Sequence, residues 1–169
     1  LILDLEIKYK MHPDENILNK YADLLVNFAL NSGKGIKKGD VVLLEVPESA
    51  KPMLIALRRA VLKSGGHSLT HYLPENISKE FYDLAEDHQI EFYPEKYLKG
   101  RVEQIDHGIH VLCDVNPREL EGVPPGKIMA RNKAFKPYMD LKNEKENQGK
   151  YTWTVALYAT KEKAEEAGL

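Results

Sequence analysis

The sequence contains a single cysteine, Cys113, so the chain cannot form an internal disulfide bond. It also lacks His-Glu-x-x-His and Cys-x-x-Cys, two patterns typical of zinc sites. No apolar run approaches the ~20 residues that a membrane-spanning helix needs. A lone cysteine is typical of reducing compartments, so we expect a cytoplasmic protein that does not enter a membrane.

An excess of charge of one sign is also missing. The chain has 24 basic and 26 acidic residues, for a net charge of −2. Binding to nucleic acid normally requires a basic face, so we expect no nucleic-acid partner. The composition is 43% hydrophobic and 30% charged, which is ordinary for a folded globular domain.

No glycine-rich phosphate-binding loop is found in the right context. Gly33, Gly35 and Gly39 lie between a predicted helix and a predicted strand, whereas a phosphate loop follows a strand and opens a helix. We interpret this cluster as a helix-ending loop. The first strand is followed by Glu48 and Ser49 without glycine, which disfavours dinucleotide binding and a nucleophile elbow. Ser49 is interpreted as a helix-capping residue.

Helical and strand-like patterns alternate along the chain. The spacing of apolar residues predicts helices at 17–28, 53–61, 76–88, 95–105 and 126–146. Two further helices are predicted to begin at Asn116–Pro117 and after Thr160. Strands are predicted at 41–46, 67–73, 109–114 and 151–158.

This alternation predicts an α/β fold. The crossovers are long enough for parallel strands, so we expect an open, mainly parallel sheet of about four or more strands with helices on both faces. The layering would be Rossmann-like or flavodoxin-like. Residues 1–169 would form a single domain.

The histidines do not form a recognisable ligand pattern. His67 and His71 would share one face of a strand, whereas His107 and His110 would point to opposite faces. We interpret their proximity to Asp106, Cys113 and Asp114 as chance clustering, with Cys113 a buried core thiol. No catalytic, cofactor-binding or metal-binding residue is therefore assigned.

In an open parallel sheet, ligands bind beyond the carboxyl ends of the strands. Here these ends are Glu48–Ser49, 74–76, 116–118 and Thr160. Arg118 is the one permanent cation among them. It is interpreted as a surface arginine, with contact to the carboxylate of a substrate or partner domain as the alternative.

Several stretches, taken in order, resemble the aminopeptidase T and aminopeptidase S family of metallopeptidases. The likeness runs from about Asn19 onward, and its order and spacing are more specific than any single stretch. The stretches are KYADLLV (20–26), KGDVVL (38–43), NPRELEGV (116–123), KIMAR (127–131), YTWTVALYAT (151–160) and AEEAG (164–168).

The resemblance implies a two-domain exopeptidase that removes N-terminal residues from peptides with two divalent metal ions, zinc, cobalt or manganese. The family's ligands, which are acidic residues, histidines and a tyrosine, lie in its second domain, so none is transferred to this chain. The chain would be the N-terminal domain, inactive alone and ending at Leu169 before the catalytic metal-binding domain. Its expected partners are that missing domain, a peptide substrate and, in the full-length enzyme, a second copy in a homodimer.

An alternative is a free-standing doubly wound binding or interaction module without catalytic activity. The alternation of helices and strands favours it equally, because such folds carry many functions. A nucleotide-dependent enzyme is a third interpretation, weakened by the missing phosphate loop.

Overall fold

A computed structural model describes residues 13–113, 116–160 and 168 of the chain. Four parallel strands form one sheet in the order β2-β1-β3-β4. The strands are β1 (Val41–Pro47), β2 (His67–Leu73), β3 (His107–Leu112) and β4 (Thr152–Leu157). The predicted parallel α/β sheet is confirmed, and its strand order matches the first four strands of the flavodoxin-like arrangement.

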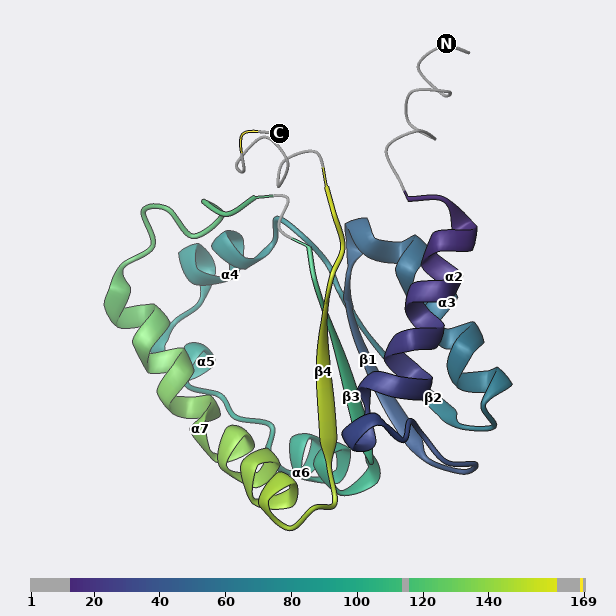
Figure 1. The fold of residues 1–169 in the computed structure, drawn as a ribbon. Helices are drawn as coiled ribbons and strands as arrows, with labels where there is room; N and C mark the ends of the chain where they lie inside the picture. Colours follow the sequence, from purple (N-terminus) through teal and green to yellow (C-terminus); the bar gives the residue numbers. More distant parts are fainter. Residues whose placement is uncertain (1–12, 114–115, 161–167, 169) are drawn as a thin grey trace.

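Helices cover both faces of the sheet, as predicted (Figure 1). The α-helices are α2 (Glu15–Leu24), α3 (Lys51–Lys63), α4 (Ser78–Leu84), α5 (Asp87–Ile90), α6 (Glu95–Gln104) and α7 (Pro125–Asn147). Shorter helical segments are η1 (Leu25–Ala29), η2 (Asn31–Gly33) and η3 (Glu48–Ala50). In the described part of the chain, no helix is both long and apolar enough to cross a bilayer.

The main hydrophobic core lies between the sheet and the helices α2 and α3. Side chains alternate along a strand, so Val42, Leu44 and Val46 of β1 point to this face. They are fully buried together with Met53 and Leu57 of α3. Burial of one such side chain contributes roughly 1.5–3 kcal/mol, so this face dominates the stability of the fold.

The opposite face of the sheet is covered less completely, by α6 and α7 (Figure 1). One cluster on this side buries Leu43, Ile105 and Tyr151, and a second joins the two helices. Toward the carboxyl ends of the strands, Leu112 and Leu157 stay more than half exposed. The half of this face near the amino ends of the strands is therefore covered, whereas the half near the carboxyl ends is open and apolar.

The helix predicted at 17–28 begins two residues earlier, at Glu15, and does not continue as one regular helix. The Asp14 carboxylate accepts a hydrogen bond from the Asn16 backbone N–H at 2.8 Å, which caps the start. At Leu25 the chain enters the π-helical segment η1. The wider turn rotates the apolar face, so Val26 is buried whereas Phe28 is exposed. Glycines with positive φ at 33, 35 and 39 then form the predicted helix-ending loop.

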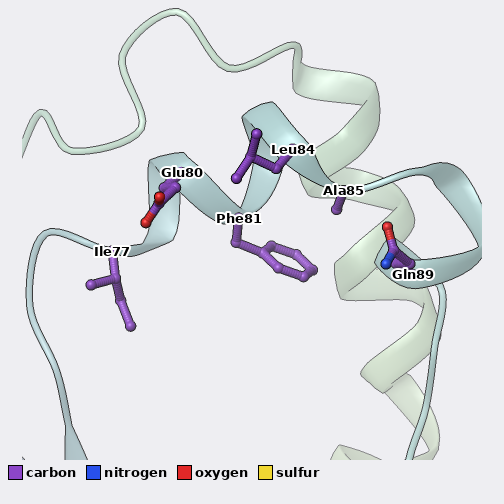
Figure 2. A pocket seen from close by; sticks show the side chains of 6 residues that line it. All are labelled: Ile77, Glu80, Phe81, Leu84, Ala85 and Gln89. Atoms are coloured by element: carbon purple, nitrogen blue, oxygen red, sulfur yellow. The ribbon is translucent and has the colours of Figure 1, made fainter.

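The single helix predicted at 76–88 is wrong, because two short helices occupy this region. Ala85 has an extended backbone between α4 and α5, and Glu86 and Gln89 form a capping box that starts α5. Ile77, Phe81 and Leu84 are apolar residues whose helical spacing predicts an inward-facing stripe, but they are exposed. They line an open pocket of about 430 Å³ beside Glu80, Ala85 and Gln89, and Figure 2 shows Ile77 and Phe81 pointing to the same side of α4.

The helix predicted at Asn116–Pro117 is also wrong, because residues 117–122 form turns. The N–H of Glu121 bonds to the carbonyl of Arg118, Gly122 has φ +84°, and two prolines follow. Proline has no N–H to donate, so the helix restarts only at Pro125, the first residue of α7. Asp114, the predicted end of the third strand, and the helix predicted after Thr160 lie outside the described residues.

Candidate functional site

Three polar side chains form a row across the centre of the sheet, on the face covered by α6 and α7. Glu45 of β1 is paired in register with His71 of β2 on one side and His110 of β3 on the other. Parallel strands in this register bring equivalent positions side by side on one face. The row therefore follows from the strand order and not from nearness in sequence.

Glu45 binds both imidazoles. Its Oε1 lies 2.8 Å from Nδ1 of His71, and its Oε2 lies 2.6 Å from Nδ1 of His110. Arg101 of α6 places Nη2 4.0 Å from Oε1 of Glu45 and donates a hydrogen bond to the hydroxyl of Tyr138 on α7. The carboxylate thus links three strands to two helices.

The electrostatics of this cluster keep Glu45 ionised. Its side chain is only 16% exposed, and burial alone would raise its pKa. Hydrogen bonds from His110 and His71, together with the charge of Arg101, outweigh burial and hold the pKa of Glu45 far below its usual range. Breaking this cluster would leave a charge without its partner at the centre of the domain.

Glu45, His71 and His110 are a candidate ligand set, but they do not fit a divalent metal. Both Nδ1 atoms are committed to Glu45, and the guanidinium of Arg101 lies against the same carboxylate. A metal ion bound to the Glu45 carboxylate would have to displace these contacts and would be repelled by the guanidinium of Arg101. Across residues 13–113, 116–160 and 168, no group of three or more His, Cys, Asp and Glu side chains is arranged to hold a metal.

A third histidine, His107, bonds to an Asp and a Thr as in a catalytic triad, but its position is structural. Its Nε2 lies 2.9 Å from Oδ2 of Asp40, and its Nδ1 lies 2.8 Å from Oγ1 of Thr152. The same Oγ1 accepts a hydrogen bond from the backbone N–H of Asn31. This row lies at the amino ends of the strands, and His107 is 6% exposed. It joins a loop to two strands instead of presenting a nucleophile.

At the carboxyl ends of the strands, where ligands bind in open parallel sheets, side chains from different loops bond to one another. Ser49 donates its hydroxyl to Oε2 of Glu75 at 2.6 Å, and its N–H to Oε1 at 3.1 Å. The prediction that Ser49 caps a helix is therefore wrong. Asn76 accepts a hydrogen bond from Asn116 at 3.0 Å, and Arg118 is exposed, as the surface interpretation predicted.

The predictions for the orientation of His107 and His110 and for the burial of Cys113 are confirmed. His107 and His110 point to opposite faces, and Cys113 is buried in the core.

Sequence reasoning missed the role of Glu45. The sequence does contain a signal for this role, which is the single acidic residue within the apolar run VVLLEV (41–46). A charge in a strand that is buried on both faces needs a partner. Which histidines supply it depends on the strand register.

This fold and its sequence define a class of protein. The model of the thermophilic metalloprotease (M29) family matches residues 14–167, and the chain belongs to that family. The predicted relation to the aminopeptidase T and S group is thereby confirmed.

Two particular relatives illustrate the match. Over 141 residues the chain is 27% identical to aminopeptidase AmpS of Bacillus subtilis (strain 168), covering 82% of this chain and 33% of AmpS. The fold is similar to that of wild-type AmpT from Thermus thermophilus, with a TM-score of 0.72 and 22% identity. That match covers 84% of this chain and 36% of AmpT. The chain thus spans about a third of the length of these relatives.

Proposed function

We propose that this chain is the N-terminal domain of a metal-dependent aminopeptidase that removes N-terminal residues from peptides. The observation that carries the proposal is the family match over residues 14–167. One relative, 27% identical over 141 residues, is named as an aminopeptidase. The alternative of a free-standing binding module is not favoured, because the chain belongs to a family of metalloproteases.

In this proposal the catalytic metals, two divalent ions such as zinc, cobalt or manganese, are held by the part of the enzyme that this chain does not contain. Paired metals polarise the scissile carbonyl and lower the pKa of a bound water. The contribution of this chain is a rigid sheet beside the substrate cavity. A cytoplasmic location, a peptide substrate and a homodimer of the full-length enzyme are further parts of the proposal.

Hydrolysis of leucine 4-nitroanilide tests the proposal with two samples. The first is the 169-residue chain alone, and the second is the product of the complete reading frame that encodes it. Each is assayed with added zinc, cobalt or manganese, and again after a chelator. We expect chelator-sensitive hydrolysis only from the second sample.

The two samples separate the two parts of the proposal. Chelator-sensitive turnover by the chain alone would show that the metals bind within residues 1–169. A folded product of the complete reading frame that cleaves no N-terminal residue with any of these metals would contradict the aminopeptidase function itself.

A further inference from the structure

A small pocket lies between α7 and the strands β3 and β4, beside the Glu45 cluster. Its volume is about 240 Å³, which corresponds to roughly eight water molecules at ~30 Å³ each. Its lining residues include His110, Met139, Lys142, Glu146 and Trp153. This space suits a solute with about as many non-hydrogen atoms as a small amino acid.

One end of the pocket carries hydrogen-bond donors. Tyr151, which also lines the pocket, is 2% exposed, and its phenol oxygen has no hydrogen-bond partner among the described residues. A Cβ built on Gly108 would lie 2.1 Å from this oxygen and 3.2 Å from Nε2 of His110, so the two polar atoms lie close to each other above β3. A buried hydroxyl without a partner is costly, and a ligand oxygen would satisfy it.

Lys142 brings a positive charge to the same pocket. Its ammonium lies 5.5 Å from the ring centre of Tyr151 and 5.7 Å from that of Tyr138. Within the described part of the chain it forms no ion pair. Burial lowers the pKa of Lys142, which the charge of Glu45 opposes in part. A partly desolvated ammonium gains more from an anion than an exposed one does.

The pocket also carries a negative charge and an apolar wall. Glu146 accepts a hydrogen bond from the indole N–H of Trp153 at 3.0 Å. Lys142 and Glu146 are four residues apart on α7, a spacing that commonly gives an ion pair. Among the described residues the two form no ion pair, and the side chains of Met139 and Trp153 beside them are half-exposed.

We propose that this pocket binds a free α-amino acid with an apolar side chain. The carboxylate would bind Lys142 and the phenol of Tyr151, the ammonium would bind Glu146, and the side chain would lie against Met139 and Trp153. The separated charges of the pocket match the separated charges of a zwitterion. The inference is independent of the proposed function, because it concerns binding by the chain itself.

Trp153 allows a direct test, because it is the one tryptophan of the sequence and lines the pocket. The 169-residue chain is titrated with L-leucine while tryptophan fluorescence is recorded, and the affinity is checked by calorimetry. The same titration is made with 4-methylpentanoate, which lacks the ammonium, and with isoamylamine, which lacks the carboxylate. We expect saturable binding of leucine and at least tenfold weaker binding of both analogues.

Three variants connect the binding to the named atoms. Lys142→Met should weaken leucine binding at least tenfold, whereas Lys133→Met, an exposed lysine of the same helix, should leave it unchanged. Tyr151→Phe removes only the phenol oxygen, keeps the buried ring and should weaken binding severalfold. Absence of saturable binding at tens of millimolar leucine would overturn the proposal. So would equal binding by Lys142→Met and the parent chain, or equal affinity for leucine and 4-methylpentanoate.

Discussion

At the scale of single residues, the covered half of the sheet depends on one contact that only glycine permits. Gly108 of β3 lies beneath the phenol of Tyr151, and a methyl group at this position would meet its oxygen at 2.1 Å and Cζ at 3.1 Å. The phenol belongs to a rigid, buried ring. The close approach of strand and ring therefore explains why a residue without Cβ lies in the middle of a strand.

Gly108→Ala should therefore destabilise the protein by about 1–3 kcal/mol, because the overpacked ring must move. Gly100→Ala is the matched control in α6: its Cβ would meet nothing within 4 Å, so stability should stay equal or rise by about 0.5–1 kcal/mol. Urea unfolding measures both. The double variant Gly108→Ala/Tyr151→Phe should recover part of the loss, and equal stability of the two alanine variants would contradict the packing argument.

The second prediction at the scale of residues concerns Glu45 and the pH dependence of the free energy of unfolding. Its pKa in the folded protein lies below the value of about 4.3 in an unfolded chain, so the ionised carboxylate stabilises the fold above that pH. The stabilisation decreases as the pH falls below about 4.3, because the unfolded state then binds the proton more readily. Glu45→Gln should cost about 2 kcal/mol at pH 7.

Unfolding free energies of the parent chain and Glu45→Gln, measured from pH 7 down to pH 3, check this sign. The difference between them should stay constant above pH 5 and shrink below about pH 4. Glu144→Gln on the exposed side of α7 should differ from the parent chain by no more than about 0.5 kcal/mol. A Glu45→Gln difference that grows as the pH falls would contradict the assigned pKa shift.

At the scale of elements, α7 is held to the rest of the domain by side chains that reach the ends of other helices. Lys145 donates hydrogen bonds to the carbonyls of Val102, Glu103 and Ile105 at 2.8, 3.1 and 2.5 Å. These carbonyls lie at and just beyond the C-terminal turn of α6, where helical partners are missing. One lysine therefore both caps α6 and docks α7.

Lys145→Met should destabilise the domain by about 1–3 kcal/mol, because three carbonyls lose their donor. Amide hydrogen exchange should increase first in the last turn of α6. Lys136→Met, which removes an exposed pair with Asp140 in the same helix, should cost no more than about 0.5 kcal/mol. If the amide hydrogens of α6 exchange at the same rate in Lys145→Met and in Lys136→Met, Lys145 does not dock α7 onto α6.

The elements also show what could be predicted from the sequence. The central strands β1 and β3 were predictable because their short apolar runs reflect burial on both faces. The break between α4 and α5 at Ala85 was not predictable, because a short break between helices changes the apolar pattern little. In addition, Ile77 and Phe81 line a pocket and do not lie in a core. For the candidate site, one acid in an apolar strand was visible, but its partner histidines depend on strand register.

At the scale of the whole molecule, the central fact is that this α/β chain belongs to a metalloprotease family while spanning about a third of two relatives. Glu45, His71 and His110, the candidate ligand set among the described residues, bind one another, and Arg101 lies beside the carboxylate. Both observations support the proposal that this chain has a scaffold role and that the metal ions bind in another part of the full-length protein.

The most direct test of this account is a count of metal ions bound by the 169-residue chain itself. The folded chain is dialysed to equilibrium against zinc, cobalt or manganese, and the bound metal is quantified before and after treatment with a chelator. The account predicts no stoichiometric binding of any of these ions. Two chelator-removable ions per chain, held by its own side chains, would contradict it.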